Sequence, residues 1–489
     1  MIETASPTVN FSKKDFAAIR KELDKRIAEL QRELRAANIP MLVVFEGWDA
    51  SGKGAVLSHL LMPLDPRGFR VRHIHPPTKL ELMYPPLWRF WRLIPGRGQI
   101  ALFNHSWYTE IWNGRAEGDL GAKAIRAAEG RIRDFERQLT DDGMVLVKLF
   151  LHIDKKEQAK RFEELQKDPA YAWKVGKAER QRHRNYGTYY SVMDASLQET
   201  HTENAPWTVV ATQDERHAVI TVARTLVAAM ETALARHSSP FGSVRSVLPA
   251  RTTQPLDAVD LGKTLALEPY SEKLPGLQAE LRRLQHIIYQ KRRPVIMVFE
   301  GWDAAGKGGA IRRLTQRLDP RGYDVMTVAA PAGDERNHHY LWRFWRDVPK
   351  AGHFCVFDRS WYGRVLVERV EGFATETEWA RAYGEINEFE SQLHESGALL
   401  FKFWVHISQE VQLERFKARE ENPFKRWKIT DEDWRNRNRW NDYYDAVSDM
   451  IEFTSTPSAP WTILEGNDKR YARIHTLQAV VDGLSAALD

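Results

Sequence analysis

The residues with the clearest chemical potential lie in the stretch GWDAAGKG, residues 301–308. Its spacing is that of a phosphate-binding loop, in which Gly301, Gly306 and Gly308 let backbone N–H groups turn toward phosphate oxygens. Lys307 would place a positive charge on the transferring phosphoryl group, and the helix that follows would add the positive end of its dipole. The alternative is a glycine-rich strand-to-helix turn with a solvated lysine.

The position after the lysine departs from the usual motif. It is Gly308, where a serine or threonine hydroxyl normally binds Mg²⁺. The metal would then need other oxygen ligands, for which Mg²⁺ prefers carboxylates and phosphate oxygens. Asp303 inside the loop and Asp358 after the apolar run HFCVF are the candidates, and Arg359 would neutralise charge that develops during transfer. The alternatives are a helix-capping Asp303 and a surface salt bridge between Asp358 and Arg359.

The loop occurs twice, because the chain is an internal repeat. FEGWDASGKG at residues 45–54 recurs as FEGWDAAGKG at residues 299–308. A period this long indicates duplication of a whole domain rather than a solenoid. The same offset separates further pairs: LDPRG at 64–68 and 318–322, LWRFWR at 87–92 and 341–346, SWY at 106–108 and 360–362, and PWT at 206–208 and 460–462.

Short apolar runs that alternate with helical patterns indicate a buried parallel sheet in each half, so we predict an α/β fold with five strands per domain. Amphipathic helices are expected near residues 13–37 and 271–291. A stretch rich in Ser, Pro, Gly and Thr separates the halves. The predicted boundaries are an N-terminal domain at 1–240, a linker and lead-in at 241–270, and a C-terminal domain at 271–489.

Composition bounds the remaining possibilities. The 489 residues require two or more domains, and no run of eighteen apolar residues indicates a membrane span. The first residues lack the apolar core of a signal peptide, and the single Cys355 excludes an intramolecular disulfide framework and a cysteine zinc site, so a cytoplasmic location is expected. The net charge of +5 weakly favours an anionic partner.

Taken together, GWDAAGKG, LDPRG, LWRFWR, FDRSWY, VERVEGF and the basic stretch at 415–428 closely resemble the polyphosphate kinase 2 family, once per half. The tandem arrangement is similar to fused two-domain members that act as polyphosphate:AMP phosphotransferases. The resemblance implies a P-loop kinase core with a mobile helical lid, and Mg²⁺-dependent phosphoryl transfer from inorganic polyphosphate to AMP, giving ADP. A homo-oligomer would fit the family. By position, the resemblance assigns catalytic roles to Asp303, Lys307, Asp358 and Arg359, and functional lid positions to Arg419 and Asp433.

The lid stretch supports a polyanionic donor without the family. Residues 415–428 carry six basic and two acidic side chains, and a polyphosphate chain needs many cations along a track. We expect Lys417, Lys425 and Lys428 to contact phosphate. The alternative is a solvated helix face with i,i+4 ion pairs.

The acceptor side rests on arginines and acids further along the chain. Arg321, Arg343, Glu368 and Asp433 are the candidates for holding the nucleotide, with Arg346 beside them, because arginine suits bidentate phosphate contacts. An open alternative for Arg343 and Arg346 is a structural one, in which both pack on Trp342 and Trp345.

The first half keeps the loop but loses the carboxylate. Asn104 and His105 stand where the second half has Asp358 and Arg359, and residues 161–174 carry three basic and three acidic groups. We therefore expect a degenerate N-terminal copy and a catalytic C-terminal one; the rival hypothesis is a second active site with altered metal use. Two other functions remain open: a nucleoside monophosphate kinase that uses ATP, and a non-enzymatic binder of nucleic acid or another polyanion. On the favoured reading neither membrane nor nucleic acid is a partner.

Overall fold

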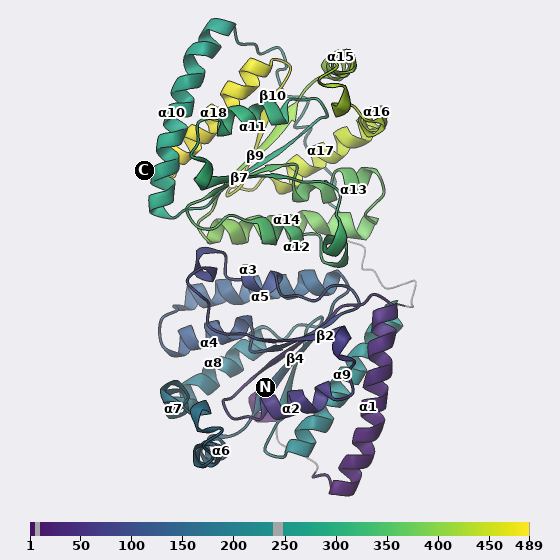
Figure 1. Cartoon of the computed structure of the whole chain (residues 1–489), viewed down its shortest axis with the longest axis vertical. Coiled ribbons are helices and arrows are strands. Elements are labelled where there is room, and N and C mark those ends of the chain that lie inside the picture. The colour runs from purple at the N-terminus through teal and green to yellow at the C-terminus, as the bar shows by residue number, and fades with distance from the viewer. Residues whose placement is uncertain (5–9, 238–247, 489) are drawn as a thin grey trace. The chain divides into compact units, whose positions relative to one another are not determined.

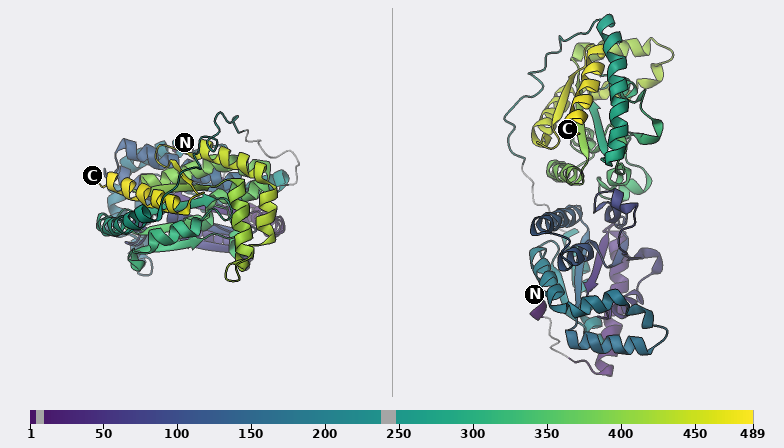
Figure 2. Two further views of the ribbon diagram at one scale, coloured as in Figure 1. Left: turned by 90° about the horizontal axis from the view of Figure 1, so that it is seen from above. Right: turned by 90° about the vertical axis from the view of Figure 1, so that its left-hand side faces the viewer.

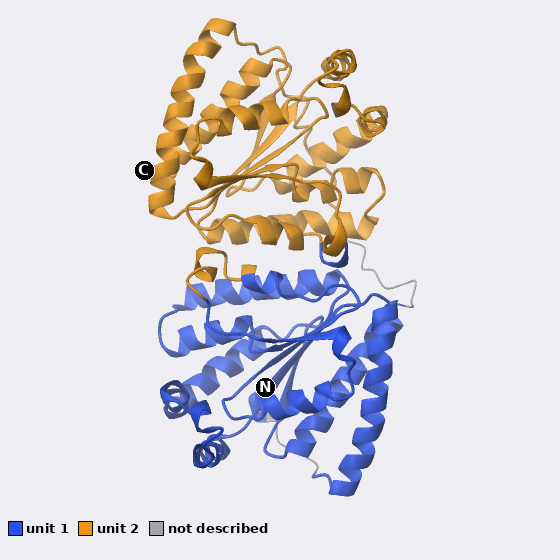
Figure 3. Ribbon diagram, viewed as in Figure 1, with its two compact units in different colours: residues 1–77, 89–242, 336–339 blue, residues 78–88, 243–335, 340–489 orange. Residues whose placement is uncertain are grey.

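The computed structural model describes residues 1–4, 10–237 and 248–488, and the chain divides into two compact units (Figure 3). Unit 1 comprises residues 1–77, 89–242 and 336–339, and unit 2 comprises residues 78–88, 243–335 and 340–489. Each unit contains one copy of the phosphate-binding loop.

Each unit is built on one parallel five-stranded sheet, which confirms the predicted α/β fold. The strand order is β2-β3-β1-β4-β5 in unit 1 and β7-β8-β6-β9-β10 in unit 2, so the two sheets have the same topology. The central strands are apolar and almost fully buried, as expected for a sheet covered on both faces. The strands are β1 (Met41–Gly47), β2 (Phe69–His73), β3 (Ile100–Asn104), β4 (Val145–His152), β5 (Trp207–Ala211), β6 (Val295–Gly301), β7 (Tyr323–Thr327), β8 (Phe354–Asp358), β9 (Leu399–His406) and β10 (Trp461–Glu465).

Helices cover both faces of each sheet (Figure 1). In unit 1 they are α1 (Lys13–Ala36), α2 (Lys53–Leu61), α3 (Trp88–Trp91), α4 (Trp107–Ala116), α5 (Ala122–Asp141), α6 (Lys155–Lys167), α7 (Lys177–Arg184), α8 (Tyr186–Glu199) and α9 (Glu215–His237). In unit 2 they are α10 (Leu267–Lys291), α11 (Lys307–Thr315), α12 (Trp342–Asp347), α13 (Val367–Val370), α14 (Glu376–Glu395), α15 (Gln409–Glu420), α16 (Asp431–Asn438), α17 (Trp440–Thr454) and α18 (Lys469–Ala486).

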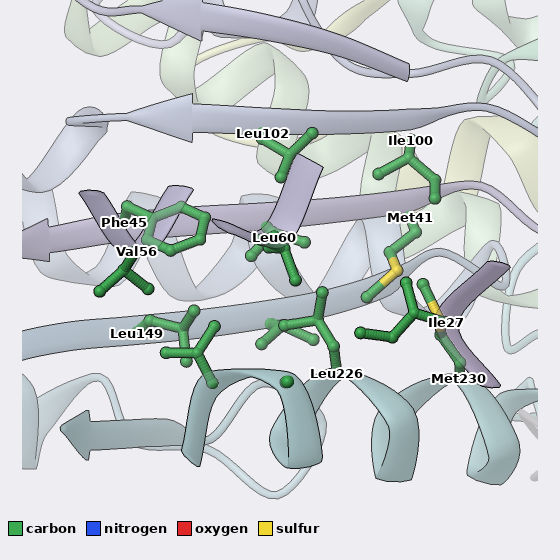
Figure 4. Packing of buried hydrophobic residues seen from close by; sticks show 14 of the residues in the cluster. Ile27, Met41, Phe45, Val56, Leu60, Ile100, Leu102, Leu149, Leu226 and Met230 are labelled. Atoms are coloured by element: carbon green, nitrogen blue, oxygen red, sulfur yellow. The ribbon is translucent and has the colours of Figure 1, made fainter. Parts of the chain in front are cut away.

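The amphipathic helices that open each half pack against the last helix of the same half. In unit 1, α1 lies against α9, and side chains from both meet the sheet: Ile27, Met41, Leu149 and Leu226 share one apolar cluster (Figure 4). In unit 2, α10 lies alongside α18 in the same way (Figures 1 and 2). The helix predicted at 271–291 begins earlier, at Leu267.

A buried ion pair fixes the opposite face of each sheet. In unit 2 the Lys402 ammonium, fully buried, donates to Glu390 at 2.8 Å, to the Tyr362 hydroxyl at 2.9 Å and to the Thr454 carbonyl at 2.6 Å. Unit 1 repeats this network around Lys148, whose ammonium lies 2.7 Å from the Glu136 carboxylate. A charge so deeply buried is tolerated because every donor has a partner. The network ties α14, β9 and α17 together.

The lead-in before α10 is anchored to unit 2. Arg251 forms ion pairs with Asp445 and Asp449 at 2.9 and 2.8 Å, and Lys263 pairs with Glu465 at 2.8 Å. Residues 241–247 of the predicted linker lie outside the described residues.

Among the described helices, α9 has the length and hydropathy of a membrane span. Its apolar side chains, such as Val222, Leu226 and Met230, belong to the core cluster of unit 1. That packing is typical of the core helix of a folded domain.

Candidate active site in the C-terminal half

The phosphate-binding loop of unit 2 connects the end of β6 to the start of α11. Gly301 has φ +153°, and a Cβ there would lie 2.6 Å from the Val405 carbonyl oxygen, so a side chain has no room. Gly306 caps α11 in the left-handed region with φ +116°. The Lys307 ammonium donates to the carbonyls of Gly301 and Trp302 at 2.7 and 3.2 Å. The loop is therefore already formed around its lysine.

An aromatic stack supports the loop from below. The Trp302 ring lies 3.8 Å from that of Trp440 at an angle of 9°, and its indole N–H donates to His406 Nδ1 at 3.0 Å. Burial lowers the pKa of His406 to about 4, so the imidazole is neutral and accepts that hydrogen bond. Because Trp440 begins α17, the stack links the loop to the segment that follows the lid.

Two carboxylates lie at the loop in different environments: Asp303 is part of the loop, and Asp358 ends β8 beside it. Asp303 accepts hydrogen bonds from Arg359 at 3.2 Å and from Asn436 at 3.0 Å. Asp358 ends β8 opposite Phe299 of β6, and no described residue donates a hydrogen bond to its carboxylate. Its charge nevertheless acts on the Lys307 ammonium. The sheet thus brings together the predicted pair Asp303 and Asp358, with Arg359 between the loop and the strand.

Glu300 is a site residue that the sequence prediction missed. It precedes the loop, is 5% exposed, and accepts a hydrogen bond from Ser360 Oγ at 2.8 Å. Burial raises its pKa, the nearby charge of Asp358 adds to this, and Lys307 and Arg359 oppose it. Its sequence signal was an acid inside a run that otherwise indicates a buried strand.

A pocket opens beside the loop. Its lining comes from the loop, α13, the lid helices and α17, and includes Glu300, Trp302, Asp303, Arg359, Gln412, Asn436 and Tyr443.

The lid helix α15 is tied to the loop by one arginine. Arg415 donates to the carbonyls of Ala304 and Ala305 at 3.0 and 2.8 Å, and to those of Gly466 and Asn467 at 2.7 and 2.9 Å. No carboxylate pairs with it within hydrogen-bond distance among the described residues. Burial, followed by the charges of Arg419 and Arg473, lowers its pKa to about 10, still far above neutral pH.

Arg415 is part of a cation cluster, which we define as Arg415, Arg419, Lys425, Lys469 and Arg473. Burial and then the charges of the other four members lower the pKa of Lys469. A Cβ at Gly309 would lie 3.3 Å from the Arg473 guanidinium, which places that group against the first turn of α11. Repelling cations held together in this way favour an anionic ligand with several charges.

The structure extends the predicted lid set. Arg419 and Lys425 lie in the cluster, whereas Lys417 is exposed on α15 and the side chain of Lys428 lies outside the described part. Lys469 and Arg473, at the start of α18, were missed by the sequence prediction. A signal did exist, because the equivalent residues of the first half are Glu215 and Val219.

The predicted nucleotide residues fall into two groups, one of which lies beside α13. Arg343 forms an ion pair with Glu335 at 3.2 Å. Burial raises the pKa of Glu368, and the charges of Arg364 and then Arg343 partly offset that rise. Glu368 itself pairs with Arg364 at 3.1 Å. Arg346 also pairs with Glu335, and its guanidinium lies 5.3 Å from the Trp342 ring centroid, as the structural alternative predicts.

The other two predicted residues have local partners. Arg321, 88% exposed, pairs with Asp319 at 2.7 Å within the turn Pro320–Gly322. Asp433 accepts hydrogen bonds from Thr430 N and Oγ1, both at 2.9 Å, and so caps α16. Neither lines the cavity.

The remaining lid contact is a latch, defined here as Glu371 with Arg435 and Arg439. Glu371 follows α13 and is nearly buried, and it lies 3.0 Å from Arg435 and 3.6 Å from Arg439. Arg435 belongs to α16 and Arg439 directly follows it, so the latch holds that helix over the cavity. The first half has Gln181 and Asn185 in place of the arginines.

Asp303 and Asp358 are the two carboxylates that a metal at the loop could use. The described residues contain no group of three or more His, Cys, Asp or Glu side chains placed to bind an ion. Two carboxylates beside a phosphate cradle are the usual protein share of a Mg²⁺ site, since substrate phosphates and water complete the shell. Asp303 and Asp358 therefore fit such an ion, with Asp358 already free of other partners among the described residues.

Comparison with known proteins shows what this arrangement is similar to. The sequence profile of the family Polyphosphate kinase 2 matches residues 10–238 and again residues 264–488. A polyphosphate:AMP phosphotransferase from Pseudomonas aeruginosa is 42% identical and covers 100% of this chain and 99% of the relative. One from Pseudomonas syringae is 41% identical over 95% of this chain and 94% of its own. The crystal structure of a polyphosphate kinase 2 from Pseudomonas aeruginosa matches with a TM-score of 0.88, at 40% identity, over 100% of this chain and 99% of that one.

Proposed function

Because the chain belongs to the polyphosphate kinase 2 family, we propose that it transfers a phosphoryl group from inorganic polyphosphate to AMP, giving ADP. Full-length relatives named polyphosphate:AMP phosphotransferase support the substrate pair. We further propose that the C-terminal half carries the reaction, with Mg²⁺, and that the reaction takes place in the cytoplasm, as the lone Cys355 suggests.

One observation carries the assignment of catalysis to the C-terminal half. In unit 2 the loop lysine is accompanied by an unpartnered Asp358, an Arg359 and the cation cluster. In unit 1, Asn104 replaces this aspartate. Of the five cluster positions, three carry leucine, tyrosine or valine in unit 1, and a fourth carries glutamate. The retained loop alone cannot supply charge neutralisation on both sides of a phosphoryl group in transit.

Asp303 and Asp358 would hold Mg²⁺, which when bound would shield the phosphate oxygens from these carboxylates and neutralise developing charge. Asp303 would have to exchange its contacts with Arg359 and Asn436 for that role. Arg359, once released, would be free to contact the transferring group.

The other residues bind and orient the substrates. Lys307 and the backbone N–H groups of the loop hold the phosphoryl group, and the dipole of α11 adds to their field. The cation cluster extends away from this point along α15 and α18, which suits a linear polyanion longer than a nucleoside triphosphate tail. Arg343, Arg364 and Glu368 are candidates for contacting the acceptor, and the latch would keep water out during transfer.

Product formation with different donors tests the proposal. Purified chain is incubated with AMP and either polyphosphate or ATP, with and without Mg²⁺, and ADP is quantified. We expect ADP from polyphosphate only when Mg²⁺ is present. ADP formation from ATP but not from polyphosphate would establish a conventional monophosphate kinase instead, and tight RNA binding without any turnover would establish a polyanion-binding protein.

A further inference from the structure

The N-terminal loop faces three histidines that have no counterpart in the C-terminal half. His73 ends β2, His75 lies two residues on, and His105 follows β3. The ring centroids of His73 and His75 are 4.4 Å apart, and those of His73 and His105 are 6.0 Å apart. Burial, followed by the charges of His75, His105 and Lys53, lowers the pKa of His73. The equivalent residues in the second half are Thr327, Ala329 and Arg359.

The loop carboxylate of unit 1 is already neutralised. Arg182 of α7 donates to both oxygens of Asp49, at 2.7 Å from Nε and 3.3 Å from Nη2. In unit 2 the same helix position holds Asn436, a neutral group that leaves the charge of Asp303 to be balanced from elsewhere. A guanidinium fixed in this way occupies the side of Asp49 on which a cation would otherwise bind.

The second acid near the loop is also fully engaged. Glu46 is 1% exposed and accepts hydrogen bonds from Ser106 Oγ at 2.7 Å and Thr109 Oγ1 at 2.9 Å, with His105 Nδ1 at 3.3 Å. Burial opposes its ionisation, but its interactions with His105 and Ser106 outweigh burial and lower its pKa. Both acids beside the N-terminal loop are therefore engaged by side chains of the same unit.

One polar group inside the loop has no partner at all. Ser51 is 1% exposed, and its hydroxyl forms no hydrogen bond with any described residue. A buried hydroxyl in this state is destabilising, whereas the alanine at the same place in the C-terminal loop, Ala305, has no polar group to satisfy. A phosphate oxygen in the loop would be a suitable acceptor for it.

We propose that the N-terminal loop is a second phosphate-binding site, which takes a phosphate group of a phosphoanhydride without a divalent cation. Lys53 and the loop N–H groups supply the positive field, the three histidines place ring nitrogens beside it, and Arg182 replaces the metal as the partner of Asp49. In the C-terminal half Asp358 has no hydrogen-bond donor among the described residues, so its carboxylate would repel a phosphate unless an ion lay between them. In unit 1, Asn104 replaces the second carboxylate and Arg182 neutralises Asp49, so a phosphate can bind without a metal ion.

The surroundings limit the ligand to a short anion. The lid stretch of unit 1 has no net charge, and Glu163, Leu165 and Glu215 stand where the C-terminal half has Lys417, Arg419 and Lys469. Among the described residues of unit 1, the cations that extend the C-terminal site along α15 and α18 have no equivalents at these positions. The site is therefore suited to a terminal or short-chain phosphate, supplied by the end of a polyphosphate or by a nucleotide, and it has no groups to drive transfer.

Hydrogen exchange of the full chain in EDTA tests this, because it reports each loop separately. Inorganic phosphate, tripolyphosphate and AMP are added in turn, and peptides covering residues 47–57 and 301–311 are followed by mass spectrometry. At ten times its dissociation constant a ligand slows local opening by about tenfold. We expect tripolyphosphate to protect the N-terminal peptide in EDTA, and the C-terminal peptide to require Mg²⁺. Protection by AMP but not tripolyphosphate would identify the source as a nucleotide.

Matched variants show whether the named residues are responsible. Lys53→Ala and the milder His73→Gln should each reduce the protection, and Arg182→Asn should make it depend on Mg²⁺ by freeing Asp49. Arg180→Asn removes an exposed charge from the same helix and should change nothing. Absence of protection in EDTA, or full protection in both Lys53→Ala and His73→Gln, would overturn the proposal. ADP formation by the C-terminal half is a separate readout, so either proposal can fail alone.

Discussion

The two halves of this chain share a fold and differ in a small set of side chains around the same loop. Both keep the loop lysine, the tryptophan–histidine hydrogen bond at 3.0 Å and the buried lysine–glutamate network. They differ at the end of the third strand, on the second lid helix and at the start of the last helix. Packing therefore preserves the fold in both copies, while the charges at the carboxyl edge of the sheet decide what each loop can do.

The largest expected effect comes from giving the C-terminal half the strand-end residue of the N-terminal half. Asp358→Asn should lower kcat by about 10²–10³-fold, because it weakens the hold on the Mg²⁺ ion that would neutralise transition-state charge. Its mirror, Asn104→Asp, should leave kcat unchanged, because unit 1 lacks the cation cluster. ADP formation at saturating polyphosphate and a Mg²⁺ titration measure both. A similar loss from Asn104→Asp would remove the distinction between the halves.

A feature that both halves share should respond to acid in the same direction. Burial depresses the pKa of His406 from 6.5 to about 4 and also lowers that of His152. The folded state resists protonation, so stability is complete above pH 6.5 and falls as the pH drops from 6.5 toward 4. For His406 the slope reaches about 1.4 kcal/mol per pH unit, roughly 3 kcal/mol over that window, and His152 changes stability in the same direction.

Urea unfolding between pH 6.5 and 4.5 measures this slope. His406→Asn keeps a hydrogen-bond acceptor for Trp302 but does not titrate, and it should flatten the pH dependence. An unchanged slope in that variant would show that His406 is not the group responsible.

The next effect concerns the cations that the sequence prediction missed. Lys469→Glu with Arg473→Val installs the residues of the first half, and should raise the KM for polyphosphate about 100-fold if each cation contributes about 1.4 kcal/mol. The dependence of log KM on log salt should become shallower, since fewer counterions are released. Lys273→Glu, an exposed charge on α10, is the control. An unaltered KM would place the polyphosphate chain elsewhere.

The smallest effect is expected from the latch. Arg435→Gln with Arg439→Asn reproduces the first half, and because partly exposed ion pairs contribute at most about 1 kcal/mol, kcat/KM should fall by about fivefold. Faster hydrogen exchange in a peptide covering residues 430–440 would accompany the loss. Unchanged exchange would mean that the latch does not hold α16.

The sequence predicted the sheets, the loop and the carboxylate pair because these depend on local patterns. Apolar runs mark β6 and β8, and the loop motif follows directly from its spacing. Comparison of the halves also identified Asn104 as the divergent position. These are the parts of the site in which residues close in sequence stay close in space.

The remaining contacts depend on tertiary structure. Lys469 and Arg473 lie far along the chain from the loop, and a lysine at the start of a helix is ordinarily solvated. Conversely, sequence alone cannot distinguish nucleotide binding by Asp433 from capping of α16, or nucleotide binding by Arg321 from an ion pair within a turn. In the structure, Asp433 caps α16 and Arg321 pairs with Asp319. The link between Asn436 and Asp303 also needed the folded lid to be seen.

We propose that the C-terminal loop catalyses phosphoryl transfer and that the N-terminal loop only binds phosphate. Substitution of the two loop lysines distinguishes these roles. Lys307→Ala and Lys53→Ala are compared with the unaltered chain for ADP formation from AMP and polyphosphate in Mg²⁺. We expect a loss of at least about 10²-fold for Lys307→Ala, while Lys53→Ala retains most of its turnover. Equal losses from the two variants would contradict it, because both loops would then be taking part in the transfer.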